Sequence, residues 1–201
     1  MKTAKIKRMV GIALMSAIVV VMQLVGSFIR FGPVSVSLVL IPIVVGAAMY
    51  GPSAGAVLGG VFGIVVLTQP DTAAFFGISV IGTVITVMGK GILAGWLAGL
   101  VYRAFCHKNR ILGVILAAIT CPVVNTGLFA LGSRVFFWDY ISSMGGAVFL
   151  FTVMIGFNFF AELAANVICA PVILRILHAP EHTKHFPGSF GCRVLFMPRV
   201  S

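Results

Sequence analysis

"IPIVVGAAMYGPSAGAVLGGVFG", residues 41–63, is apolar enough to lie in a lipid bilayer, yet Gly51-Pro52 interrupts it near the middle. Proline lacks a backbone donor and disfavours helical backbone at the residue before it. The stretch is therefore either one kinked membrane helix or two short helices joined at the break. This choice decides on which side of the membrane every later segment lies.

The composition places the chain in a membrane. Of its 201 residues, 60% are hydrophobic and only 9% are charged, whereas about half the residues of a soluble domain are apolar and about a quarter are charged. The net charge of +10 does not indicate a nucleic-acid partner, because the basic residues flank apolar runs and form no single patch. Lysines and arginines are distributed in this way on the cytoplasmic side of membrane proteins.

The positive charges choose between the two alternatives at Gly51-Pro52. The basic start of the chain, residues 2–8, places the N-terminus in the cytoplasm. One span over residues 38–68 would put the basic segment 103–110 outside, whereas two spans put it inside. We therefore predict an all-α membrane protein, a six-transmembrane-helix bundle with both termini cytoplasmic. The expected helices are residues 9–28, 38–50, 53–68, 78–102, 111–137 and 148–177.

Small residues recur at four-residue spacing on several of these helices. Lipid gives helices no hydrophobic reason to associate, so small residues that let two backbones approach take over that role. We interpret the two glycine series as internal packing surfaces and leave the alanine pair open between packing and docking. The series are Gly55, Gly59 and Gly63; Gly91, Gly95 and Gly99; and Ala13 with Ala17.

Two ionisable residues interrupt predicted helices, and such residues are functional candidates by default. Lys90 and Glu162 each precede a basic residue of the inner flank, Arg103 and Arg175, by 13 residues. Both therefore lie about 20 Å from that flank. We predict that they face one another or share a polar cavity, either as a structural ion pair or as ligand contacts.

Amide side chains extend this polar set. Asn158, Glu162 and Asn166 lie on one side of the last helix, and Asn125 follows a bend expected at Pro122. Asn125 and Asn158 lie in the outer half by residue count, with Gln23 at similar depth and Arg134 at the outer rim. With the loop "RFGPVSVS", residues 30–37, which includes Ser37, these groups could line a pocket that opens outward. Each single asparagine could instead bond neighbouring helices.

No motif in the chain indicates enzymatic chemistry. The segment "VMGKG" lacks the first glycine and the Ser/Thr of a phosphate-binding loop, and neither HExxH nor GxSxG occurs. We expect no catalytic residue, metal or cofactor.

The chain resembles the substrate-binding S components of energy-coupling factor (ECF) vitamin importers over about residues 5–177. The residues that carry the resemblance are AxxxA at Ala13 and Ala17, "IPIVVGAAMYGPSAGAVLG", "KGILAGWLAGLVYR", "CPVVNTGLFALG" and "NFFAELAANVICAPVILRIL". The resemblance implies a six-helix membrane substrate-binding domain over residues 1–177. We expect residues 178–201 to form a polar, poorly ordered cytoplasmic tail.

The resemblance also implies partners and a site. Such proteins capture a vitamin or related small molecule outside the cell, and we expect a bacterial plasma membrane. They dock on a coupling transmembrane subunit that two cytoplasmic ATPase subunits drive, and Ala13 and Ala17 are implied to form the docking face. The implied pocket lies at the first external loop and the outer parts of the last three helices. The candidate ligand contacts are Asn125, Asn158, Glu162, Lys90, Arg134 and Ser37.

Two other functions stay open on the sequence. A self-sufficient small transporter or channel could use Lys90 and Glu162 for ion coupling, and a membrane-embedded structural or enzyme subunit is the third possibility. The ligand is not specified either, although Arg134 and Lys90 would suit a carboxylate or phosphate group.

Overall fold

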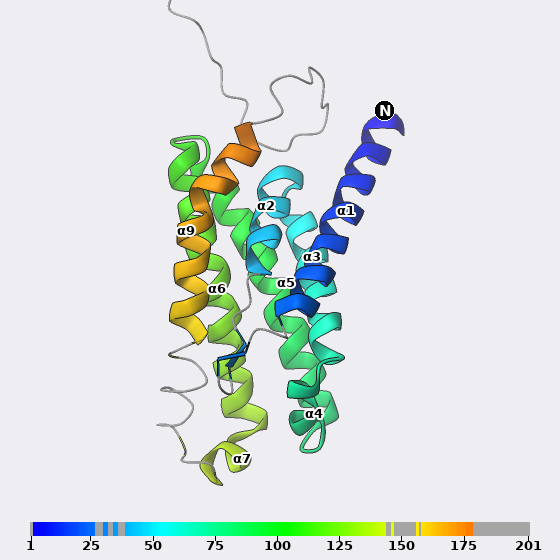
Figure 1. The fold of residues 1–201 in the computed structure, drawn as a ribbon, viewed down its shortest axis with the longest axis vertical. Helices are drawn as coiled ribbons and strands as arrows, with labels where there is room; N and C mark the ends of the chain where they lie inside the picture. The colour runs from blue at the N-terminus through cyan, green and yellow to red at the C-terminus, as the bar shows by residue number, and fades with distance from the viewer. Residues whose placement is uncertain are drawn as a thin grey trace, which may run out of the picture.

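The computed structural model describes residues 2–26, 30–31, 34–35, 39–143, 146, 156 and 158–178, and these residues form a helical bundle (Figure 1). Short elements connect the long helices: the paired two-residue strands β1 (Arg30–Phe31) and β2 (Val34–Ser35), and the helices α4 (Pro70–Phe76) and α7 (Trp138–Ser143). The long helices are α1 (Lys2–Gly26), α2 (Leu40–Tyr50), α3 (Pro52–Leu67), α5 (Val80–Phe105), α6 (Arg110–Phe136) and α9 (Asn158–His178).

Residues suited to helix starts mark where the helices begin. The Ser79 hydroxyl accepts a hydrogen bond from the Gly82 amide at the start of α5, and the Asn109 side chain accepts one from the Ile111 amide at the start of α6. Pro52 and Pro70 occupy the first position of α3 and α4, where a missing amide hydrogen costs nothing.

The chain reverses direction at Gly51. This residue has φ of +92°, a conformation that glycine adopts without strain, and it separates α2 from α3. The two helices run antiparallel, because Gly46 lies against Leu58 and Gly55 lies against Ala47. The structure therefore has two helices here and not one kinked helix, as the charge distribution predicted.

Arg8 of α1 binds this turn directly. Its Nη2 donates hydrogen bonds to the Tyr50 carbonyl oxygen at 3.0 Å and to the Ser53 hydroxyl at 2.8 Å. Gly11, less than one turn further along α1, packs against the Tyr50 ring. The start of α1 is thus attached to the end of the α2–α3 pair.

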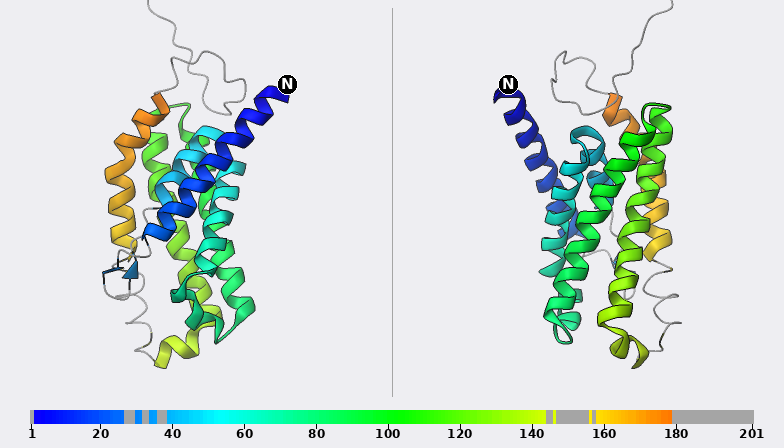
Figure 2. Two further views of the ribbon diagram at one scale, coloured as in Figure 1. Left: turned by 45° about the vertical axis from the view of Figure 1, so that its right-hand side comes forward. Right: turned by 180° about the vertical axis from the view of Figure 1, so that it is seen from behind.

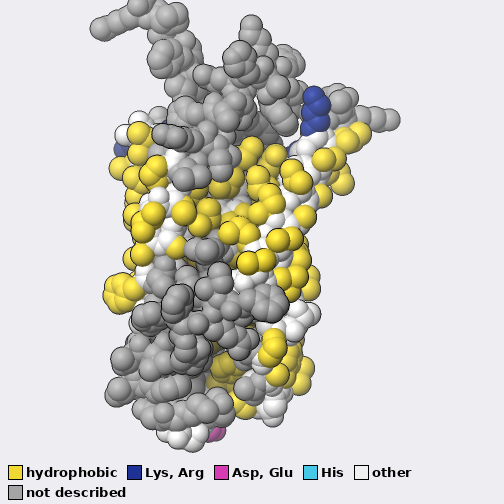
Figure 3. All heavy atoms as spheres, viewed as in Figure 1, with side chains coloured by type: hydrophobic (Ala, Val, Ile, Leu, Met, Phe, Trp, Pro, Cys, Tyr) yellow, Lys and Arg dark blue, Asp and Glu magenta, His cyan; other side chains and the backbone are white. Residues whose placement is uncertain are grey.

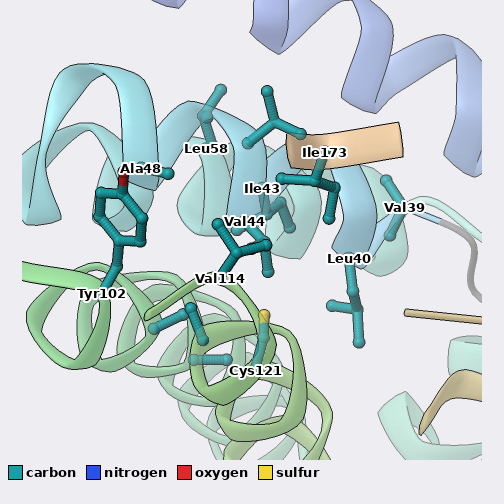
Figure 4. Close-up of a cluster of buried hydrophobic side chains, with 14 of the residues drawn as sticks. Val39, Leu40, Ile43, Val44, Ala48, Leu58, Tyr102, Val114, Cys121 and Ile173 are labelled. Carbon is teal, nitrogen blue, oxygen red and sulfur yellow. The ribbon is translucent and has the colours of Figure 1, made fainter. Parts of the chain in front are cut away.

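Helix α2 lies at the centre of the bundle. It contacts α1, α3, α5, α6 and α9, and eight of its 11 residues are buried. Leu40, Ile43 and Val44 of α2 pack against side chains of α3, α5, α6 and α9 in one apolar core (Figure 4). At about 1.5 Å per residue, α2 is only about 17 Å long. A helix of this length cannot cross a bilayer by itself, and here the neighbouring helices cover it.

The two glycine series form the contact between α3 and α5. A Cβ atom at Gly59 would collide with the backbone of Gly91, and one at Gly91 would collide with the backbone of Gly59. Gly55 and Gly95 are related in the same reciprocal way. This contact confirms that the glycine series are internal packing surfaces, and it fixes α5 in position next to α6.

The bundle has the surface of a membrane protein. Apolar side chains cover the middle of its described part, and basic ones lie towards the end where α1 begins (Figure 3). Both the start of α1 and the end of α9 lie at this end, whereas α4 and α7 lie at the opposite end (Figures 1 and 2). Three described helices, α1, α5 and α6, are long and apolar enough to cross a membrane, while α2 and α3 are apolar but shorter.

Some predicted boundaries differ from the observed ones. Helix α1 begins at Lys2 instead of residue 9, and α4 lies between the predicted helices 53–68 and 78–102, where no helix was expected. Pro70 explains the second difference, since its fixed φ favours a helix start. The last described helix begins at Asn158. Residues 148–155 and 157, also predicted helical, lie outside the described residues, as does the tail 179–201.

Candidate functional site

A polar cluster lies at the contact between α6 and α9, and α5 packs on the same helix α6. Its centre is Glu162 of α9, whose side chain is 1% exposed. Asn125 of α6 donates a hydrogen bond from Nδ2 to Glu162 Oε2 at 3.4 Å, and Asn166 donates from Nδ2 to the Glu162 carbonyl oxygen at 2.9 Å. Both asparagines are buried as well. Three polar side chains from two helices thus meet in an apolar interior.

Lys90 of α5 supplies the positive charge of this cluster. The negative charge of the Glu162 carboxylate favours the charged ammonium form of this lysine, which is consistent with the predicted shared polar region. The same ammonium lies 4.7 Å from the centroid of the Phe129 ring of α6. An ammonium over an aromatic face gains further electrostatic stabilisation.

Several buried oxygen atoms of the cluster lack hydrogen-bond partners in the structure. Asn125 and Asn166 each use the amide nitrogen, which leaves the Oδ1 atom of each without a partner. A buried acceptor without a partner costs about 1–3 kcal/mol. Three hydroxyls of α5 and α6 share this property, those of Thr86, Thr126 and Ser133. A ligand or water that donates hydrogen bonds would remove this cost.

Aromatic rings continue from the cluster towards the end of the bundle that holds α4 and α7. The Phe129 ring meets the Phe75 ring of α4 edge-on at 6.1 Å between centroids. Phe75 in turn meets Phe137 at 5.0 Å. Through these ring contacts, the part of the cluster near Lys90 is connected to the short helix α4 at the end of the bundle.

Arg134 does not join this cluster. Its side chain is exposed, and its guanidinium carbon lies 4.0 Å from the centroid of the Trp138 ring. Nine residues separate Arg134 from Asn125, which is about 13 Å along the α6 axis and about half a turn around it. The two side chains therefore leave α6 in nearly opposite directions. Asn158 begins α9, but its side chain and the whole of Ser37 lie outside the described residues.

The alanine pair of α1 lies on the outer side of that helix. Ala13 and Ala17 are exposed. The side of α1 that packs on the bundle carries Val19 and Gln23, which are both buried. Positions 17 and 19 are about 160° apart around a helix, so the two sides are almost opposite. The pair therefore takes no part in the core of the chain.

Gln23 belongs to a contact that the sequence did not indicate. Its Nε2 donates to Gln69 Oε1 at 3.1 Å, and Gln69 Nε2 donates to the Gln23 carbonyl oxygen at 3.3 Å. Both residues are at least nine-tenths buried. Gln23 was expected near an outward pocket, whereas it joins α1 to the turn between α3 and α4. Only the paired amide chemistry of two glutamines could have suggested this contact.

The cluster has the composition of a binding site for an organic molecule. It combines one carboxylate, one ammonium, two amides and an aromatic ring. Within the described residues, no group of three or more His, Cys, Asp or Glu side chains is placed to hold a metal ion.

The chain was compared with known proteins. A protein-family model described as "ECF transporter, substrate-specific component" matches residues 7–174. This range includes α2, α3, α5 and α6 in full, most of α1 and α9, and every residue of the polar cluster. No curated protein and no solved structure matches.

Proposed function

Since the chain belongs to the substrate-specific components of ECF transporters, we propose that it captures a vitamin or related small molecule outside the cell for ATP-driven uptake. Members of this family are subunits of membrane transporters and not enzymes, and they work with membrane and ATPase components. The apolar helices of the chain fit a multi-pass membrane protein of this kind.

The buried cluster around Glu162 is the observation that carries the proposal. Polar and charged groups in a membrane interior are costly, and where they occur they commonly mark sites of binding or transport. Here the groups come from three helices and leave two amide oxygens without partners. We propose that Asn125, Glu162 and Lys90 contact the ligand directly.

We further propose that this site opens to the outside. Asn125 lies 15 residues from the start of α6 and 11 residues from its end, which is about 22 Å and about 16 Å along the axis. The nearer end is the one with α4 and α7, and the exposed basic residues Lys5, Lys7 and Arg103 lie at the other. Following the positive-inside rule, we propose that both termini lie in the cytoplasm, and that the cell is bacterial. Asn158, Ser37 and Arg134 remain candidates for the outer part of the pocket.

Helix α1 is the proposed contact with the coupling transmembrane subunit. Ala13 and Ala17 are exposed between larger exposed apolar residues, Val10, Leu14, Ile18 and Val21. Small residues between large ones let a partner helix approach closely. Two cytoplasmic ATPase subunits would drive the complex.

Transport assays with and without the partners test the proposal. The chain is reconstituted into lipid vesicles alone, or with the coupling subunit and both ATPases, and uptake of the molecule that co-purifies with the chain is followed with ATP supplied. We expect uptake only from the complete assembly. Uptake at a comparable rate by the chain alone would instead indicate a self-sufficient carrier.

A further inference from the structure

The orientation of the Asn125 and Asn166 side-chain amides shows which hydrogen-bond partners the cluster lacks. Asn125 Nδ2 faces a carboxylate oxygen, and Asn166 Nδ2 faces a backbone carbonyl oxygen. Neither amide can be turned over, because its oxygen would then face another acceptor. Both Oδ1 atoms therefore remain as acceptors without partners in the buried cluster. N–H or O–H donors at these two positions would stabilise the cluster.

The charges of the cluster limit the ligand further. The Lys90 ammonium and the Glu162 carboxylate attract each other, so the cluster has no formal net charge. A ligand carboxylate would place a second negative charge near Glu162 in a region of low dielectric constant, and it would offer no donor to the amide oxygens. A ligand ammonium group would satisfy those oxygens but would repel Lys90.

Lys90 adds a requirement for an acceptor. Its ammonium group has three N–H donors, and no hydrogen bond joins it to the described part of the chain. An adjacent carbonyl on the ligand would accept from Lys90 while its N–H group donates to an asparagine oxygen. An amide in which N–H and C=O are neighbours meets both needs without adding charge, and unlike a rotating hydroxyl it holds donor and acceptor in a fixed geometry.

We propose that the cluster binds an uncharged amide-type edge of its ligand, such as a lactam, a ureide or an amide-containing ring. The N–H groups donate to Asn125 Oδ1 and Asn166 Oδ1, and the carbonyl oxygen accepts from the Lys90 ammonium. The inference rests on the proposed function and specifies its substrate class. It also replaces the expectation that Lys90 would recognise a carboxylate or phosphate.

Small fragments test this chemistry without knowledge of the whole ligand. The full-length chain in lipid nanodiscs is titrated with 2-imidazolidinone, with its 1,3-dimethyl derivative, and with sodium acetate, and binding is measured by ligand-observed NMR. The derivative keeps the ring and the carbonyl but has no N–H, so the comparison isolates the donors. We expect saturable binding of 2-imidazolidinone only. Equal or tighter binding of the derivative or of acetate, or no binding of any fragment, would overturn the proposal.

Variants locate the binding. Asn125→Leu and Asn166→Leu each remove one amide oxygen at similar volume, and loss of one neutral hydrogen bond should weaken 2-imidazolidinone about three- to tenfold. Thr120→Val is the control, because the Thr120 hydroxyl bonds the Leu116 carbonyl oxygen on α6, outside the cluster. Unchanged affinity in both asparagine variants would contradict the proposed site. Co-purification of the coupling subunit, measured on the same variants, tests the proposed function separately.

Discussion

Asn125 of α6 donates a hydrogen bond to Glu162 of α9 at 3.4 Å, and the two residues are 37 positions apart in the chain. The contact holds a buried carboxylate in a bundle whose other core side chains are mostly apolar. Lys90 of α5 provides the opposite charge from a third helix. The polar cluster therefore has a structural role in addition to the proposed binding role, and the two roles can be measured separately.

A double-mutant cycle on Lys90 and Glu162 measures the structural role. Glu162→Gln keeps the shape but leaves the lysine without its counter-charge. Since Lys90 is partly accessible, we expect a loss of about 1–3 kcal/mol in the free energy of unfolding, below the loss typical of a fully buried pair. Lys90→Met combined with Glu162→Gln should recover at least half of that loss. Additive effects in thermal unfolding would show that the two charges do not interact.

Because α3 and α5 touch through glycines, adding one methyl group to α5 should destabilise the protein at some positions and not at others. Gly91→Ala places a Cβ against the Gly59 backbone, which cannot move aside as a flexible side chain could. We expect destabilisation by about 1–3 kcal/mol. Gly89→Ala, two residues earlier in α5, meets nothing within 4 Å and is the matched control. Thermal unfolding that affects both variants equally would contradict the packing described for Gly91.

The pair of Gln23 and Gln69 predicts non-additive mutations. Gln23→Leu leaves Gln69 Oε1 without its donor, and Gln69→Leu leaves Gln23 Nε2 without its acceptor, so each change should cost about 1–3 kcal/mol. Replacing both removes both polar groups, so the double variant should be more stable than the sum of the single effects implies. Urea or thermal unfolding of the four proteins provides the test. Strict additivity would mean that the two side chains do not depend on each other.

Because Ala13 and Ala17 of α1 are exposed, we expect a large side chain there to impair assembly with the coupling subunit but not ligand binding. Ala17→Trp adds a large ring where a partner helix is proposed to approach, so co-purification with the coupling subunit should fall at least tenfold while ligand retention stays unchanged. Ile168→Trp, on an exposed position of α9 that is 74% accessible, is the control for tryptophan on a lipid-facing surface. Loss of ligand retention in Ala17→Trp would instead place this face in the folded core.

Much of the fold could be predicted because the responsible patterns are local. The charge of residues 2–8 and 103–110 required a reversal at Gly51, which the structure shows. Equal spacing from basic flanks placed Lys90 and Glu162 at one depth, and they interact. Four-residue glycine spacing indicated close packing, and the structure shows that the glycine series of α3 packs against that of α5.

The remaining features depend on how elements approach each other. Residue counting gave depth along α6 but no direction around it, so it did not show that Arg134 leaves the helix on another side than Asn125 and stacks on Trp138. The Gln69 contact depends on the path of α1 past the α3–α4 turn, which no local pattern specifies. The lack of partners at the two amide oxygens could not be inferred either, because it depends on the rotation of each side chain.

The most direct test of the account is the small molecule that the chain retains after gentle purification, identified and quantified by mass spectrometry. We expect near-stoichiometric retention by the wild type and by Thr120→Val, and reduced retention by Asn125→Leu. The retained molecule should carry an uncharged amide-type group. Equal retention by Asn125→Leu would contradict a binding site at Asn125 and Glu162.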